Sequence, residues 1–194
     1  DCLSVEFVER YSNERVTFIK IDGKVNRSVN DYRFYEYLKL LPKISSEFVF
    51  FTDISDVSVF NPLVDDQLCH GELYLGKDQW DIPQVKDSGW MREKIVSFKG
   101  APEVANYIRK QEFLSSELLN AGIIGGDRHT VSKFLSEVCQ ILNKCAPEIN
   151  SNMLAVNIIA CEWLRHKLRI NSSDVFFSKF KAFEDNGNFL FRHK

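Results

Sequence analysis

The feature that most constrains the fold is an unbroken apolar run at 48–51 (FVFF) that leads directly into two carboxylates, Asp53 and Asp56. A short strand that is apolar at every position is typical of one covered by helices on both faces. A second apolar run lies at 118–124. Because buried strands of this kind occur where helices cover a sheet, the two runs favour an α/β architecture.

Helical and strand patterns alternate along the chain, which predicts a three-layer α/β fold with helices on both faces of the sheet. The segment at 77–90 is polar and is expected to be a loop, and Gly125 and Gly126 are expected to form a turn after a strand. The periodicity predicts helices over 3–11, 30–41, 102–111, 130–142 and 152–168, and strands over 16–21, 48–51, 57–60, 71–76, 118–124, 175–177 and 189–191.

The 194 residues correspond to one domain, which we expect to span residues 1–194. The net charge of -2 argues against a dedicated nucleic-acid binder, which would carry a basic excess. No apolar run reaches about 18 residues, so no transmembrane segment is expected. The chain opens without a signal-peptide pattern, and its five cysteines lack C-x-x-C spacing, which favours reduced thiols. The lack of a signal-peptide pattern and the reduced thiols together predict a cytoplasmic protein.

Asp53 and Asp56 follow a buried strand, and open α/β sheets bind ligands outside the carboxyl ends of their strands. Carboxylate oxygens are hard ligands that suit Mg²⁺ or Mn²⁺. A metal ion held there can neutralise a diphosphate and act as a Lewis acid when the diphosphate departs. The alternative is that the two aspartates only cap a turn, and taken alone the two interpretations have about equal weight.

The segment at 50–57 (FFTDISDV) resembles the acidic motif of the GT-A glycosyltransferases, which use nucleotide sugars. The usual motif is Asp-x-Asp after a buried strand, whereas this chain has Asp-x-x-Asp. That variant is similar to the one in the glycosyltransferase domain of collagen lysyl hydroxylases. The difference leaves open which of Asp53, Ser55 and Asp56 contact the metal ion.

Other segments resemble the same family. The stretch at 120–126 (NAGIIGG) is similar to the strand that lines the donor and acceptor pocket, where glycine lets backbone approach a sugar closely. The helix over 31–39 resembles the one that directs a basic residue at the donor. Arg33 is the first candidate and Lys39 the second, because arginine can donate to two oxygens of a diphosphate. On an amphipathic helix, however, an arginine is more often simply solvated.

The chain ends in His193 and Lys194. In several GT-A families a late histidine segment completes the metal shell and contacts the diphosphate. By this resemblance His193 is the third metal ligand and Lys194 is a phosphate contact. The plain alternative is an exposed histidine without a role.

The resemblance implies a GT-A fold with a mixed sheet and a metal-dependent glycosyltransferase activity. The donor would be a nucleoside-diphosphate sugar, most directly a UDP-sugar, and the acceptor a hydroxyl of a glycan or glycoprotein. The metal ion would be Mn²⁺ or Mg²⁺. The residues that the resemblance assigns are Asp53, Asp56 and His193 for the metal, Arg33, Lys194, Asp53 and Gly125 for the donor, and Asn120 and Asp127 for catalysis.

Two departures from the family pattern matter. GT-A domains begin with a strand that forms part of the base pocket, whereas this chain begins with a helix pattern, so we expect that strand upstream of Asp1 or a differently built pocket. Many members also carry an acidic residue before the last long helix, where this chain has amides at Asn150 and Asn152 and no carboxylate within 150–153 (NSNM). Asp127 and Glu148 are the candidates to replace it, and the catalytic base stays open.

Two other classes of function compete with this hypothesis. HAD-type phosphatases also place an aspartate after a buried strand, but their signature is Asp-x-Asp, and the position two after Asp53 is Ser55. A non-catalytic module that keeps the fold and binds a protein or glycan would tolerate the missing first strand. Metal-dependent hydrolysis of a sugar nucleotide, lost in Asp53→Ala, would separate an enzyme from such a module.

Overall fold

The structure is a computed structural model that describes residues 3–21, 26–53, 56–61, 67–78, 82–173 and 189–193. Its helices are α1 (Val5–Tyr11), α2 (Val29–Leu40), α3 (Gly89–Val96), α4 (Pro102–Tyr107), α5 (Gln111–Leu114), α6 (Arg128–Leu142) and α7 (Asn152–Arg165). Its strands are β1 (Phe48–Thr52), β2 (Val57–Val59), β3 (Glu72–Lys77), β4 (Leu119–Asp127), β5 (Arg169–Asn171) and β6 (Phe191–His193). The predicted mixture of helices and strands is confirmed.

The main sheet has the strand order β1-β4-β3-β5, and β2 pairs with β6 in a separate two-stranded ribbon. Strand β4 is antiparallel to both β1 and β3, while β3 and β5 are parallel, so the sheet is mixed. Because β1 and β3 both oppose β4, they run in the same direction. Their carboxyl ends therefore meet at the edge of the sheet where β4 begins.

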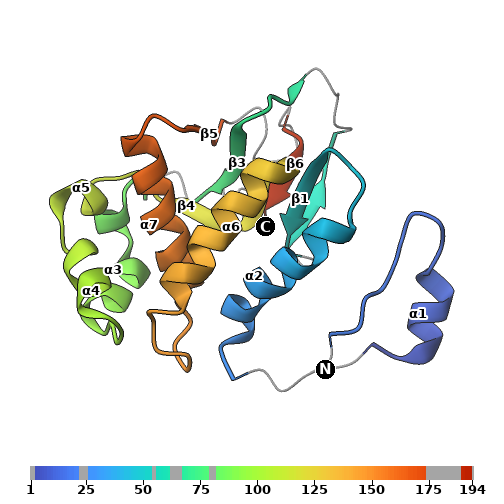
Figure 1. The fold of residues 1–194 in the computed structure, drawn as a ribbon, viewed down its shortest axis with the longest axis horizontal. Helices are drawn as coiled ribbons and strands as arrows, with labels where there is room; N and C mark the ends of the chain where they lie inside the picture. Colours follow the sequence, from blue (N-terminus) through green and yellow to red (C-terminus); the bar gives the residue numbers. More distant parts are fainter. Residues whose placement is uncertain are drawn as a thin grey trace.

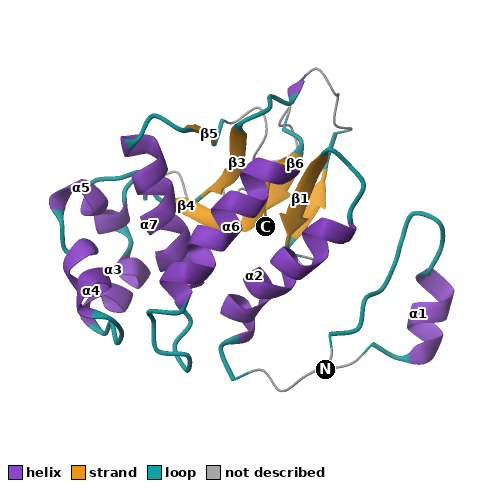
Figure 2. Cartoon of the chain, in the orientation of Figure 1, coloured by secondary structure: helices purple, strands orange, loops and turns teal. Residues whose placement is uncertain are grey.

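Helices α2, α6 and α7 lie across one face of this sheet, and the short helices α3, α4 and α5 gather beside α7 (Figures 1 and 2). Alternate strand residues face these helices, as the two-residue period of a strand requires. None of the described helices is both long and apolar enough to cross a bilayer. The core between this face and the helices includes Phe34, Val49, Leu73, Leu75, Ile124, Val131, Phe134, Leu135, Val138 and Leu154.

The opposite face of the sheet carries a second, smaller apolar cluster. There Tyr74 and Ile123 pack with Leu190 and Phe191 of the ribbon end, and the rings of Phe50 and Phe191 lie 5.0 Å apart between centroids. In the part of the chain that the structure describes, this face is thus packed by the β2–β6 ribbon. A third layer of helices, as in a GT-A fold, stays a prediction.

The start of β4 is clamped to α7 by one buried side chain. The Oδ1 atom of Asn157 accepts a hydrogen bond from the backbone N–H of Leu119 at 2.9 Å, and its Nδ2 atom donates to the Leu119 carbonyl at 2.9 Å. Asn157 also donates to the Met153 carbonyl one turn earlier. The amide side chain thus satisfies both backbone groups of the first residue of a fully buried strand.

We predict that Asn157→Ala lowers the free energy of unfolding by about 2–4 kcal/mol, because it leaves a buried N–H and a buried carbonyl of Leu119 without partners. Urea unfolding followed by circular dichroism measures the change. Gln140→Ala on the exposed side of α6 is the control and should stay within about 0.5 kcal/mol of the parent. Equal midpoints for the Asn157 variant and the parent would contradict the clamp.

One predicted strand is wrong. Residues 17–21 form no strand, and Val16 makes only an isolated bridge with Asn13. Ile19 and Ile21 are more than half exposed, and a strand without a neighbour leaves its backbone groups to water. This segment and α1 lie to one side of the molecule, beyond α2 (Figure 1).

The predicted turn at Gly125 and Gly126 is also wrong, since both residues lie inside β4. A Cβ at Gly125 would collide with the Phe50 ring, and one at Gly126 would lie 2.7 Å from the Glu72 carbonyl oxygen. Glycine is therefore required here for close approach of neighbouring strands and not for a change of direction.

Other elements differ in detail. The expected helix over 102–111 is divided into α4 and α5, and α3 begins inside the segment expected to be a loop. The strands expected at 48–51, 57–60, 71–76 and 118–124 are confirmed as β1 to β4, with small shifts of their ends. The strand expected at 175–177 lies outside the described residues.

Candidate metal and ligand site

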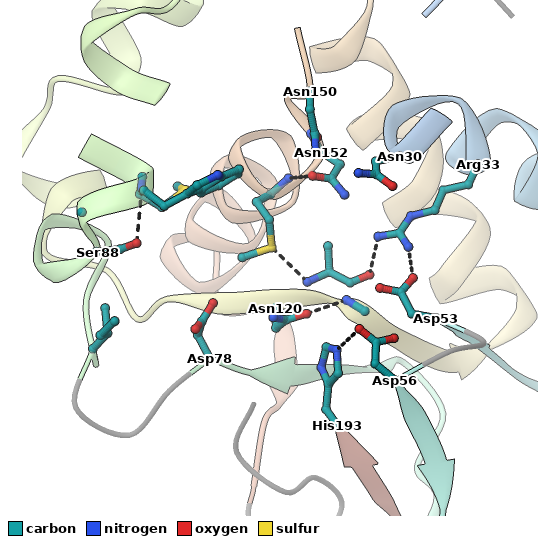
Figure 3. Close-up of a pocket in the computed structure, with 17 residues that line it drawn as sticks. Asn30, Arg33, Asp53, Asp56, Asp78, Ser88, Asn120, Asn150, Asn152 and His193 are labelled. Carbon is teal, nitrogen blue, oxygen red and sulfur yellow. Dashed lines mark hydrogen bonds and ion pairs between the residues drawn. The ribbon is translucent and has the colours of Figure 1, made fainter. Parts of the chain in front are cut away.

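A pocket of about 450 Å³ opens at the edge where β1 and β3 end and β4 begins. Its size is in the range of small-molecule sites. Side chains from distant parts of the chain, from Asn30 to His193, meet there (Figure 3). The labelled polar residues that line it are Asn30, Arg33, Asp53, Asp56, Asp78, Ser88, Asn120, Asn150, Asn152 and His193.

Local backbone hydrogen bonds bring the two aspartates together. The N–H of Asp53 donates to the carbonyl of Gly122 on β4 at 2.9 Å, which extends the β1–β4 pairing by one residue. The N–H of Val57 then donates to the Asp53 carbonyl at 3.2 Å and turns the chain back. Because Val57 pairs with His193 in the β2–β6 ribbon, the histidine lies beside Asp56.

Asp53, Asp56 and His193 each offer a ligand atom, and these atoms all lie within 4.8 Å of one another. The Nε2 atom of His193 is 3.6 Å from Oδ2 of Asp56. Two atoms that coordinate the same Mg²⁺ lie about 3–4 Å apart, so small side-chain movements would let all three residues coordinate one ion. The Oδ1 atom of Asp56 is buried and accepts no hydrogen bond from the described residues. A buried carboxylate oxygen of this kind fits a cation.

The surroundings of His193 favour the neutral form that a metal ion needs. Its side chain is 3% exposed, and this burial lowers the pKa of the imidazole, although the nearby Asp56 carboxylate opposes the shift. At neutral pH the ring is therefore neutral, and only a neutral imidazole can donate a lone pair to a metal ion. Two carboxylates and one imidazole form a donor set suited to Mn²⁺ or Mg²⁺.

The histidine ring is seated directly over a glycine. A Cβ added to Gly122 would collide with the His193 ring and lie 3.0 Å from Oδ1 of Asn120. The Asn120 Oδ1 atom itself accepts a hydrogen bond from the Gly122 N–H at 2.7 Å. The glycine at this position therefore makes room for both the candidate ligand and a neighbouring amide.

We predict that Gly122→Ala weakens Mn²⁺ binding at least tenfold, because the added methyl group displaces the His193 ring. Titration of Mn²⁺ followed by electron paramagnetic resonance of the free ion measures this. Gly76→Ala is the matched control. Gly76 also lies in the sheet, on β3, but a Cβ there meets atoms no closer than 3.6 Å. Mn²⁺ binding by Gly122→Ala equal to that of the Gly76→Ala control would show that His193 is not a ligand.

Arg33 reaches this group from α2. Its Nη1 atom pairs with Oδ1 of Asp53, and its Nη2 atom donates to the carbonyl of Ala121 at 3.2 Å. Figure 3 shows Arg33 and His193 approaching the two carboxylates from different sides. Burial lowers the pKa of Arg33, but a guanidinium stays charged at any ordinary pH. The pocket therefore contains a fixed cation next to the candidate metal ligands.

A buried aspartate aligns α2 with the start of α7. Both carboxylate oxygens of Asp31 accept hydrogen bonds from the Ser151 N–H, at 3.0 and 3.1 Å. This contact brings Asn150 and Asn152 to the same pocket as Arg33. Burial raises the pKa of Asp31, and the backbone hydrogen bond from Ser151 opposes that shift. The amides Asn150 and Asn152, which stand where the GT-A pattern has an acidic residue, thus line the pocket.

The structure brings together most of the residues that the sequence assigned to one site. Asp53, Asp56 and His193 line the pocket with Arg33 and Asn120. Ser55 and Lys194 lie outside the described residues.

The second basic candidate and the predicted donor glycine do not reach the pocket. Lys39 is exposed and pairs with Glu36 on its own helix. Gly125 packs against the Phe50 ring and does not line the pocket. Neither residue is therefore placed to contact a donor there.

Asp127 was predicted to be catalytic but lies at the far end of β4. It is seven residue steps from Asn120, which at ~3.3 Å per step is about 23 Å along the strand. Its carboxylate caps α6, accepting from the backbone N–H of Thr130 at 3.0 Å and from its hydroxyl at 2.6 Å, and also from the Gly71 N–H at 2.8 Å. Asp127 ends β4 as the N-cap of α6, and it does not line the pocket.

We predict that Asp127→Ala lowers the free energy of unfolding by about 1–2 kcal/mol at pH 7, as loss of an N-cap does. Burial raises the pKa of this carboxyl, but the hydrogen bonds from Thr130 and Gly71 outweigh burial and hold it below its usual value. The stabilisation is therefore present above the unfolded pKa of about 3.9 and is lost as the pH falls through the lower folded pKa. Urea denaturation of the parent and the variant at pH 7 and pH 3 measures the difference in their free energies of unfolding. A difference that is the same at both pH values would contradict the cap.

Sequence reasoning missed several residues of the pocket, among them Asp78 and Trp90. Asp78 directly follows β3 and lines the same edge as Asp53, which follows β1. The rule that ligands bind beyond the carboxyl ends of strands would have identified both. Trp90 on α3 lines the pocket and is 40% exposed. No pattern marked it, because α3 lies partly within a segment that was expected to be a loop.

No family model matches this chain, and a search of curated proteins also found no match. The geometry of the pocket and the resemblance of its motifs are therefore the basis for a functional proposal.

Proposed function

We propose that this protein is a metal-dependent glycosyltransferase that uses a nucleoside-diphosphate sugar, most directly a UDP-sugar. The observation that carries the proposal is the meeting of Asp53, Asp56 and His193 with Arg33 in one pocket. Three of these residues come from the acidic motif and the end of the chain, and Arg33 comes from the preceding helix. Their sequence order is the one that the GT-A resemblance implies.

The two aspartates and His193 would hold Mn²⁺ or Mg²⁺, which supplies a Lewis acid for the departing diphosphate. Arg33 would bind the same diphosphate with its planar set of donors. Both groups would face the negative charge that grows as the bond to the sugar breaks, which is where a fixed cation lowers the barrier most. The acceptor would be a hydroxyl of a glycan or glycoprotein.

Asp78 replaces Asp127 as the acidic candidate on the acceptor side. It lines the pocket beside Asn120, apart from the two aspartates of the metal group (Figure 3). In an enzyme that inverts the anomeric carbon, this carboxylate would take the proton of the acceptor hydroxyl. Asn120 would orient the sugar through its amide side chain.

We predict that UDP with Mn²⁺ raises the melting temperature of the parent and that Asp56→Ala abolishes this shift. A ligand at 100 times its dissociation constant adds about 2.7 kcal/mol, roughly 5–10 °C for a domain of this size. ADP and GDP serve as nucleotide controls. Glu112→Ala, which removes an exposed carboxylate on α5 away from the pocket, should keep the full shift.

The melting experiment, combined with an assay for hydrolysis of UDP-sugars and of a simple phosphate ester, separates the competing functions. A shift that needs both UDP and Mn²⁺, together with hydrolysis of a UDP-sugar, supports the transferase. Tight binding without any hydrolysis would support a non-catalytic module. Hydrolysis of a simple phosphate ester without any response to UDP would support a phosphatase. No response of the parent to any nucleotide with Mn²⁺ would contradict the proposal.

A further inference from the structure

We infer that Arg33 takes the place of the metal ion on Asp53 and that metal binding transfers its guanidinium to the donor diphosphate. The inference rests on the proposed function and concerns how that site is regulated. It makes Arg33 a competitor of the metal ion when no donor is present. It also makes Arg33 a partner of the metal ion once the diphosphate is bound.

The charges of the pocket favour such an exchange. Asp53 and Asp56 offer ligand atoms within 4.8 Å of each other. Two neighbouring carboxylates repel each other unless a cation lies between or beside them. Arg33 supplies that cation, since its Nη1 atom pairs with Oδ1 of Asp53.

The pair is also protected from solvent. The side chains of Arg33 and Asp53 are 19% and 29% exposed, so water screens their attraction less than it would at the surface. A divalent ion bound by Asp53, Asp56 and His193 would place two more positive charges beside the guanidinium. Binding the ion must therefore weaken the Arg33–Asp53 pair. The free energy lost with this pair reduces the affinity for the ion when no donor is bound.

The remaining donors of Arg33 can then serve a phosphate. Its Nη2 atom is held by the Ala121 carbonyl, which keeps the guanidinium at the pocket wall. Its Nε atom is buried and donates to no acceptor among the described residues. Release from Asp53 would thus leave Nη1 and Nε available on a side chain that is still anchored. A diphosphate that bridges the ion and this guanidinium would restore the lost contact, so ion and donor bind cooperatively.

The test measures Mn²⁺ and UDP binding separately in Arg33→Gln. Without nucleotide, the variant should bind Mn²⁺ about tenfold more tightly than the parent, because Asp53 has lost its competitor. At saturating Mn²⁺, it should bind UDP at least tenfold more weakly. Free Mn²⁺ is followed by electron paramagnetic resonance and UDP by calorimetry. Lys39→Gln is the matched control, since it removes the same charge from an exposed position on the same helix and should change neither affinity.

A second variant separates exchange from simple repulsion. Arg33→Lys keeps the positive charge but replaces the planar set of donors by a single ammonium, so it should bind Mn²⁺ more tightly than the parent and less tightly than Arg33→Gln. Thermal unfolding confirms that each variant is folded.

Different results would overturn the exchange and the proposed function. Mn²⁺ binding by Arg33→Gln that equals or falls below that of the parent would overturn the exchange, as would an Arg33→Lys variant that matches the parent. The proposed function would stand in either case if the parent binds UDP with Mn²⁺. Absence of both Mn²⁺ and UDP binding in the parent would overturn the proposed function and the inference with it.

Discussion

The arrangement of the site depends on how the buried strand β4 is held in place. Every residue of β4 is buried, and its first residue is fixed by the two hydrogen bonds between Asn157 and Leu119. The next residues, Asn120 to Gly122, form the floor of the pocket. Since β1 and β3 both take their register from β4, the same clamp decides where Asp53 and Asp78 emerge. A polar contact inside the core thus determines the geometry at the edge of the sheet.

Much of the fold could be predicted because its signals are local. The apolar runs that became β1 and β4 and the strong periodicity of α6 need no knowledge of their neighbours. The segment over 16–21 has the same kind of apolar pattern, yet it forms no strand, because a strand also needs a partner that supplies its hydrogen bonds. Gly125 and Gly126 show the complementary limit. Their role depends on the Phe50 ring and the Glu72 carbonyl on the two neighbouring strands, which no local pattern reveals.

The candidate site could be predicted to the extent that a motif carried it. Asp53 and Asp56 were marked by the apolar strand before them, and Arg33 and His193 by the resemblance to the GT-A pattern; the structure places all four in one pocket. Asp127 lies outside the pocket, because an aspartate at the end of a strand can serve as a ligand at one edge of a sheet or as a helix cap at the other. Strand direction decides between these uses. Asp127 is the last residue of β4, which runs opposite to β1, so its carboxylate lies at the edge away from the pocket.

Strand pairing also explains how a residue close to the end of the chain reaches a motif in its first third. The turn after Asp53 leads into β2, and the pairing of Val57 with His193 sets the imidazole beside Asp56. The Phe50–Phe191 contact holds the same ribbon against the sheet, and Gly122 leaves the space that the imidazole ring occupies. The third candidate ligand is therefore positioned by backbone pairing, one aromatic contact and the absence of one methyl group. A change in any of these would separate the histidine from the two aspartates without altering a candidate ligand itself.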